Sequence, residues 1–210
     1  SDGTFSGAIN GTGSLLKTSN GLLSLSGSNA YSGATSVNVG TLTLSGTLAS
    51  TAVTVASGAT LNAQSGSALS ATTTLTAEGL VNLFNSGVTL QTLLGAGIVN
   101  LDTTALTLSN GTFSGALNGT GSLVKTSSGL LTLSGSNAYS GATSVNGGTL
   151  TLSGTLASAA VSVASGATLN AQSGSALAAT TTLTAEGLVS LFNAGLCRYP
   201  LDVRTLTIGI

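Results

Sequence analysis

Charged and aromatic residues are scarce in this sequence. Of its 210 residues only nine are charged, four Lys or Arg and five Asp or Glu, and His, Met and Trp do not occur. Without His, neither a Ser-His-Asp nor a Cys-His catalytic arrangement can be assembled. Four basic residues are also too few for the basic surface by which proteins bind nucleic acid or anionic lipid. We therefore expect neither partner.

The few acidic residues are too dispersed for carboxylate or metal chemistry. Glu78 and Glu186 lie far apart in the sequence, and the Asp residues are isolated. Glycoside hydrolysis needs two facing carboxylates, and a calcium site needs several oxygen ligands close together. We therefore predict that the chain is not an enzyme, with no catalytic residue, no metal and no cofactor.

Long apolar runs and paired cysteines are missing as well. No stretch approaches 18 consecutive apolar residues, so we expect no membrane insertion by this segment. The first residues lack the basic and apolar regions of a signal peptide. A single Cys permits no internal disulfide bond.

Small residues make up much of the sequence. The chain has 34 Thr, 32 Ser and 30 Gly, yet 41% of it is hydrophobic, mainly Leu, Val and Ala. Disordered chains combine low hydrophobicity with high net charge, whereas this chain has a net charge of −1. The composition therefore predicts a folded protein whose apolar core is thin and extended.

A tandem repeat organises most of the chain. Residues 3–87 recur as residues 111–195, with 75 identities in 85 positions, and the substitutions keep apolar positions apolar. We predict a first unit at residues 1–110, a second, incomplete unit at 111–195, and an atypical tail at 196–210. The tail holds Cys197, both Arg and the only Pro, and it is either a terminal cap or non-native.

Within each unit, apolar residues alternate with Thr or Ser. Examples are Thr41-Leu-Thr-Leu44 and Ala52-Val-Thr-Val55, and Gly- and Asn-containing turns separate such runs. A period of two is typical of strands with one buried face. Strands at this spacing fit a sandwich, a barrel or a solenoid, and the long internal repeat favours the solenoid. Coils of about 21 residues would give about five coils in a unit and about ten in the chain.

The segment from Gly13 to Leu42 carries a recognisable motif. It contains Gly-Ser-Leu-Leu-Lys ending at Lys17, a Leu-Ser-Gly-Ser-Asn run ending at Asn29, and a Tyr-Ser-Gly-Ala-Thr run beginning at Tyr31. This segment and its copy at 121–150 resemble the passenger-associated repeat of bacterial autotransporters. The resemblance implies an all-β, right-handed parallel β-helix at the extracellular or outer-membrane surface of a Gram-negative bacterium. The motif residues of both copies are Lys17, Gly27, Asn29, Tyr31, Gly33, Lys125, Gly135, Asn137, Tyr139 and Gly141.

We assign structural roles to these residues rather than ligand contacts. The two Lys are expected to be solvated charges that keep the surface soluble. The two Tyr are expected to pack over a bend, and Asn29, Asn62 and Asn85 to form turns, with side-chain ladders between coils as the alternative. The four Phe, at positions 5, 84, 113 and 192, are expected in the core or at coil ends.

These expectations lead to two functional hypotheses. The first is a non-catalytic extracellular rod, serving as a stalk, spacer or adhesin segment that contacts a host or cell surface. The second is a fibre subunit that stacks end to end, because a solenoid end exposes unpaired backbone groups.

Overall fold

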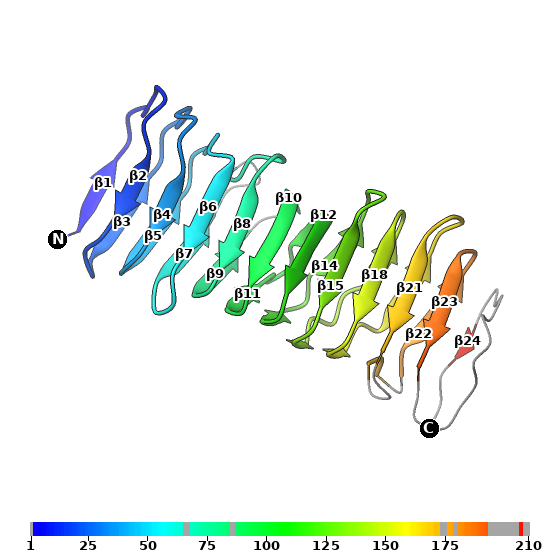
Figure 1. Cartoon of the computed structure of the whole chain (residues 1–210). Coiled ribbons are helices and arrows are strands. Elements are labelled where there is room, and N and C mark those ends of the chain that lie inside the picture. Colours follow the sequence, from blue (N-terminus) through cyan, green and yellow to red (C-terminus); the bar gives the residue numbers. More distant parts are fainter. Residues whose placement is uncertain are drawn as a thin grey trace.

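The protein is a parallel β-solenoid. The computed structural model describes residues 2–64, 68–84, 87–172, 176–178 and 180–192, together with the backbone of residues 206–207. Its strands lie side by side along a rod, with the N-terminus at one end (Figure 1). Consecutive turns pair in parallel register, and there are about nine of them, close to the ten expected. The predicted parallel β-helix is therefore confirmed.

Three faces surround the core of the rod. Face A is a seven-stranded sheet, and a two-stranded sheet follows it along the rod. The seven-stranded sheet consists of β1 (Gly3–Phe5), β3 (Leu22–Leu25), β5 (Thr41–Leu44), β7 (Thr60–Ala63), β9 (Leu80–Leu83), β11 (Ile98–Asn100) and β13 (Ala116–Asn118). The two-stranded sheet consists of β16 (Ser136–Asn137) and β19 (Thr155–Leu156).

Face B precedes face A within each turn. It begins with β2 (Leu15–Lys17), β4 (Thr35–Val37), β6 (Ala52–Val55) and β8 (Thr74–Ala77). It continues through the second halves of β10 (Gly87–Gly95) and β12 (Ala105–Phe113) into β15 (Leu130–Leu133), β18 (Thr149–Leu152), β21 (Thr168–Ala171) and β23 (Leu188–Leu191).

Face C closes each turn. In the first turns it is only a line of single bridges that joins Asn29, Leu48 and Leu69. Farther along, it consists of the first halves of β10 and β12, then β14 (Ser122–Lys125), β17 (Thr143–Val145), β20 (Ala160–Val163), β22 (Thr182–Ala185) and β24 (Leu206–Thr207). The pair β22–β24 is antiparallel, unlike the other strand pairs of the described chain.

The alternating sequence produces the core. In β5, Leu42 and Leu44 are fully buried, whereas Thr41 and Thr43 stay partly exposed. The same alternation recurs in β7 and β8, so that Leu and Val side chains stack in columns inside the rod. Burying one such side chain contributes about 1.5–3 kcal/mol, which makes these columns the main source of stability.

Aromatic residues enter this core less than the sequence analysis predicts. Phe113 is fully buried, in agreement with the expectation. Phe5, Phe84 and Phe192 are 43%, 49% and 58% exposed, so of the two expected positions, core or coil end, the core is wrong for these three. These three rings therefore lie at the outside of the rod, whereas the rings of Phe113, Tyr31 and Tyr139 are buried in it.

Turn length is less uniform than the sequence analysis predicts. The turn that brings Ser122 beside Ala105 is shorter than expected, whereas the turn that brings Thr74 beside Ala52 is slightly longer. Corners absorb this variation, because only the strands must keep register for the ladder hydrogen bonds to form.

Candidate functional site: the repeat motif and the outer surface

The motif lysines lie inside the rod, which corrects the expectation of solvated charges. Lys17 is 5% exposed and Lys125 is 0% exposed. Lys17 is the last residue of β2, and Lys125 is the last residue of β14. Each side chain points inward, like that of the Leu two residues before it. Burial of an ammonium group destabilises a folded protein unless hydrogen bonds compensate for the lost water. The hydrogen-bond partners of each lysine therefore determine whether the fold can accommodate it.

Backbone carbonyl groups supply those partners. Lys17 Nζ donates to Ser19 O and, at 3.2 Å, to Val39 O of the next turn. Lys125 Nζ donates in the same way to Ser127 O and, at 3.1 Å, to Gly147 O. Each ammonium group therefore ties its own corner to the corner one turn later. Burial lowers the pKa of Lys125.

The motif asparagines connect successive turns by the same principle. Asn29 Nδ2 donates to Gly27 O at 2.9 Å and to Thr47 O at 3.2 Å. Asn137 Nδ2 donates to Gly135 O and Thr155 O, both at 3.0 Å. Both side chains are 1% exposed, so each is a buried link between turns. This is a larger role than the turn formation predicted for Asn29.

The motif tyrosines are buried side chains with one polar contact each. Tyr31 Oη and Thr35 Oγ1 are 2.7 Å apart, and Tyr139 Oη and Thr143 Oγ1 are separated by the same distance. Burial raises the pKa of both phenols, and the Thr hydroxyl opposes that rise. The rings rank among the largest fully buried side chains of the described residues. A Tyr with a satisfied hydroxyl group thus fills a corner that Leu would leave partly empty.

The motif glycines are required by close stacking of corners. A Cβ atom at Gly27 would lie 2.0 Å from Gly7 O, and one at Gly135 would lie 1.8 Å from Gly115 O. Gly33 and Gly141 face carbonyl oxygens of the preceding turn in the same manner, at 2.2 and 2.1 Å. No L side chain fits such a space, so glycine at these positions permits the corners of successive turns to approach closely.

Hydroxyl groups that the sequence analysis overlooked complete the corners. Ser50 Oγ donates to Gly33 O at 2.8 Å, and its copy Ser158 donates to Gly141 O at 2.7 Å. Thr73 and its copy Thr181 donate to the carbonyl groups of those two serines at 3.0 and 2.8 Å. Each of these hydroxyls is fully buried. The strand alternation could have identified Thr35 as buried, since it shares the inward phase of Val37.

A ladder of asparagine side chains runs along the outside of face A. Asn82 Nδ2 donates to Asn62 Oδ1 at 2.9 Å, and Asn100 Nδ2 donates to Asn82 Oδ1 at 2.8 Å. The alternative of a ladder between coils is therefore confirmed for Asn62. Asn85 lies outside the described residues.

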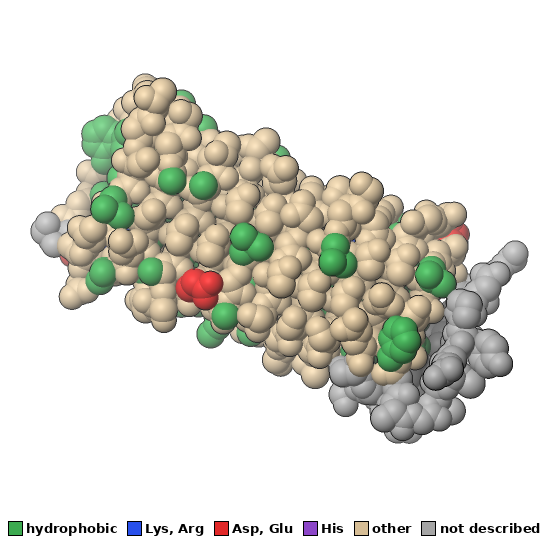
Figure 2. All heavy atoms as spheres, in the orientation of Figure 1, with side chains coloured by type: hydrophobic (Ala, Val, Ile, Leu, Met, Phe, Trp, Pro, Cys, Tyr) green, Lys and Arg blue, Asp and Glu red, His purple; other side chains and the backbone are tan. Residues whose placement is uncertain are grey.

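The outer surface carries little charge. With both lysines buried, the exposed charged side chains of the described part are acidic: Asp2, Glu78, Asp102 and Glu186. On the face seen in Figure 2, scattered hydrophobic side chains lie among uncharged polar ones, and no basic side chain is visible. In the part of the chain that the structure describes, such a surface offers neither a basic patch nor a cluster of charges.

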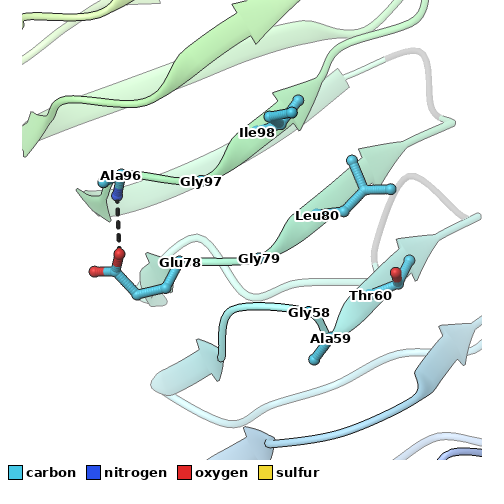
Figure 3. A pocket seen from close by; sticks show the side chains of 9 residues that line it. All are labelled: Gly58, Ala59, Thr60, Glu78, Gly79, Leu80, Ala96, Gly97 and Ile98. Carbon is cyan, nitrogen blue, oxygen red and sulfur yellow. Dashed lines mark hydrogen bonds between the residues drawn. The ribbon is translucent and has the colours of Figure 1, made fainter.

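An open groove of about 370 Å³ lies where three successive turns pass from face B to face A. Its walls are Gly58, Ala59, Thr60, Glu78, Gly79, Leu80, Ala96, Gly97 and Ile98. The Glu78 carboxylate accepts a hydrogen bond from the Ala96 N–H group at 3.2 Å, while Leu80 and Ile98 project from the neighbouring strands (Figure 3). The wall holds a single ionisable side chain, so the groove offers no acid–base pair.

Among the described residues, no group of three or more His, Cys, Asp or Glu could hold a metal ion. Nor does any helix there have the length and apolar character needed to cross a membrane.

The stacked turns and their buried corner links define a class of protein, the parallel β-solenoid rods built from tandem repeats. Within that class, the family model described as the passenger-associated-transport repeat matches residues 15–44 and 123–152. The resemblance seen in the sequence is thereby confirmed: the chain carries two copies of the repeat of autotransporter passenger domains.

A curated relative agrees with this assignment. The adhesin BmaC autotransporter of Brucella suis biovar 1 (strain 1330) is 34% identical over 151 residues. The match covers 68% of this chain but only 4% of the Brucella protein, so the chain corresponds to a small part of that relative. No solved structure matches the chain.

Proposed function

We propose that the chain is a non-catalytic rod segment of an autotransporter adhesin, outside the cell or at the outer-membrane surface of a Gram-negative bacterium. The observation that carries this proposal is the pair of passenger-associated-transport repeats, stacked in one continuous solenoid. The similarity to a Brucella adhesin supports the same role.

The buried corner links support the mechanical part of the proposal. A rod that holds a binding region away from a cell must resist separation of its turns, and here buried lysine and asparagine side chains join each motif turn to the next. Hydrogen bonds that involve a charged group contribute about 1.5–3 kcal/mol each, more than neutral ones. These buried polar side chains therefore hold successive turns of the rod together; they do not form a reaction centre.

The division into two modules belongs to the same proposal. Residues 1–110 and 111–195 act as successive copies of one building block, with 196–210 as a separate tail. The support is that three motif contacts of the first copy recur in the second: those of Lys17 with Val39 O, of Asn29 with Gly27 O, and of Tyr31 with Thr35 Oγ1.

Electron microscopy and bead adhesion test the proposal together. At about 4.8 Å per turn, nine turns predict isolated rods about 43 Å long. Beads coated with the chain are expected to attach to cultured epithelial cells more than beads coated with the variant Leu22→Lys/Leu130→Lys, which changes exposed side chains only. Equal attachment of both beads would restrict the role to a stalk. Long filaments in the micrographs would instead favour the fibre subunit.

A further inference from the structure

The sequence contains five Asn-Gly steps, at Asn10, Asn20, Asn110, Asn118 and Asn146. Such a step can deamidate without an enzyme, because glycine lacks the Cβ atom that would keep its backbone nitrogen away from the asparagine side chain. The reaction requires a main chain that can turn at the asparagine and a glycine N–H group that no hydrogen bond holds. The fold separates the five steps by these two requirements.

Two of the steps are held by strands. Asn110 lies inside β12, where Gly111 pairs in register with β10 on one side and β15 on the other. The Asn110 side chain also accepts a hydrogen bond from Thr92 Oγ1 at 2.8 Å. Asn118 ends β13, and its carbonyl group accepts a hydrogen bond from the Leu101 N–H group at 2.7 Å. Ring closure at either asparagine would first have to break these contacts.

The other three steps lie between strands and have exposed asparagine side chains. Asn10 and Asn20 belong to the first unit, and neither step contacts a lysine ammonium group. Asn146 lies between β17 and β18, and its N–H group donates to Lys125 O at 2.8 Å. Among the described residues, the Asn146 side chain, the Asn146 carbonyl group and the Gly147 N–H group form no hydrogen bond. The groups that ring closure moves at Asn146 are therefore unconstrained by hydrogen bonds to the described chain.

The step at Asn146 supplies part of a buried contact, the Lys125 link, by which Lys125 Nζ donates to Ser127 O and Gly147 O. The first unit has the equivalent contact without the reactive step, because Val39 stands in place of Gly147 and its carbonyl group accepts from a lysine at 3.2 Å. The branched side chain of valine hinders the approach of its own nitrogen to the preceding asparagine. The two units therefore share one contact but differ in its chemical durability.

We propose that Asn146 is a site of spontaneous deamidation and that the reaction opens the Lys125 link. The Gly147 nitrogen attacks Asn146 Cγ, and a new N–Cγ bond forms. The Cγ–Nδ2 bond breaks, and ammonia leaves with the proton of the Gly147 N–H group. Water then opens the cyclic imide at one of its two carbonyl groups and restores the N–H group. The product is aspartate, or isoaspartate, in which the main chain runs through the former side-chain carbonyl carbon.

The isoaspartate product changes the corner. It adds one carbon to the main chain between Cα of residue 146 and the Gly147 nitrogen, so Gly147 O no longer keeps its 3.1 Å distance from Lys125 Nζ. The buried ammonium group then retains Ser127 O and loses the partner that belongs to the next turn. A buried charge with fewer hydrogen bonds destabilises the fold, so the second unit loosens with age. This chemistry needs only water and does not depend on the proposed function.

Peptide mapping tests the site. Trypsin cleaves after Lys and Arg, so residues 126–198 form a peptide whose one Asn-Gly step is at Asn146, whereas the peptide 18–125 contains Asn110 and Asn118. The folded chain and a urea-unfolded sample are incubated at mildly alkaline pH, digested and compared with fresh protein by mass spectrometry. In the folded chain we expect conversion of Asn146 while Asn110 and Asn118 remain amides, and in urea we expect conversion of all three. An unchanged Asn146, or equal conversion of all three in the folded chain, would overturn the proposal.

A matched variant tests the opening of the Lys125 link. Asn146→Gln keeps an exposed amide, but glutamine must close a larger ring and is expected to stay intact during the same incubation. The two fresh proteins should have equal urea midpoints, and the incubated parent protein should have a lower midpoint than incubated Asn146→Gln. Fresh Asn146→Asp carries the added charge on an ordinary main chain and should keep the midpoint of the fresh parent protein. Equal midpoints after incubation, or an equal fall in Asn146→Asp, would refute the opening of the link by isoaspartate. No binding partner is used, so this result is independent of the bead experiment.

Discussion

Replacement of Lys125 by Met tests whether the buried ammonium group holds the rod together. Met keeps the unbranched apolar stem but removes the donors to Ser127 O and Gly147 O. Two hydrogen bonds from a charged donor stabilise the folded protein by about 3–6 kcal/mol. Desolvation of the ammonium group opposes this with a cost of several kcal/mol. We expect a net loss of about 2 kcal/mol in the free energy of unfolding, because the two carbonyl groups lose their partner without gaining another.

The assay is urea denaturation followed by circular dichroism, in parallel for Lys125→Met and Lys17→Met. The midpoint is expected to fall in both variants with the slope unchanged, which identifies a change in stability rather than in the denatured state. The loss should be smaller at Lys17, which lies near the end of the rod, where turns separate at lower cost. A midpoint that stays equal or rises in Lys125→Met would refute the reasoning, because buried charges replaced by apolar groups often stabilise when their hydrogen bonds are weak.

The other predictions concern pH, glycine stacking and the buried phenol. Because burial lowers the pKa of Lys125, the unfolded chain binds more protons at this site between that lowered value and the ordinary 10.5. The free energy of unfolding of the parent protein should therefore rise with pH across this interval, compared with that of Lys125→Met. Urea midpoints of both proteins at pH 8 and 10 measure this difference. The same pH dependence in both proteins would contradict the prediction. Gly135→Ala should lower the melting temperature by several degrees, since its Cβ would overlap a carbonyl oxygen at 1.8 Å, whereas Gly13→Ala has no atom within 4 Å and should leave the melting temperature unchanged. Tyr139→Phe should cost about 1 kcal/mol in a urea titration by leaving the Thr143 hydroxyl without its partner, and an unchanged midpoint would assign the stabilisation to the ring alone.

The fold class and the repeat could be predicted from the amino-acid sequence. Alternation of Leu or Val with Thr in segments such as 41–44 requires one buried and one exposed strand face, and the near identity of residues 3–87 and 111–195 requires the same packing twice. The roles of glycine and asparagine at corners were only partly accessible, because a turn residue and a link between turns have the same local signature. Gly27 becomes indispensable only when Gly7 of the preceding turn lies against it.

The burial of the lysines and the face on which each repeat unit begins depend on contacts between turns and could not be predicted from the sequence. The alternation in Leu15-Leu-Lys17 places Lys17 on the inward side, yet a buried lysine is acceptable only because Val39 O, one turn later, meets its ammonium group. The starting face depends on the sum of unequal turn lengths, and a small difference in that sum changes the face on which the next unit begins. Strand propensity is local, whereas these two features depend on contacts one turn away and on lengths accumulated over several turns.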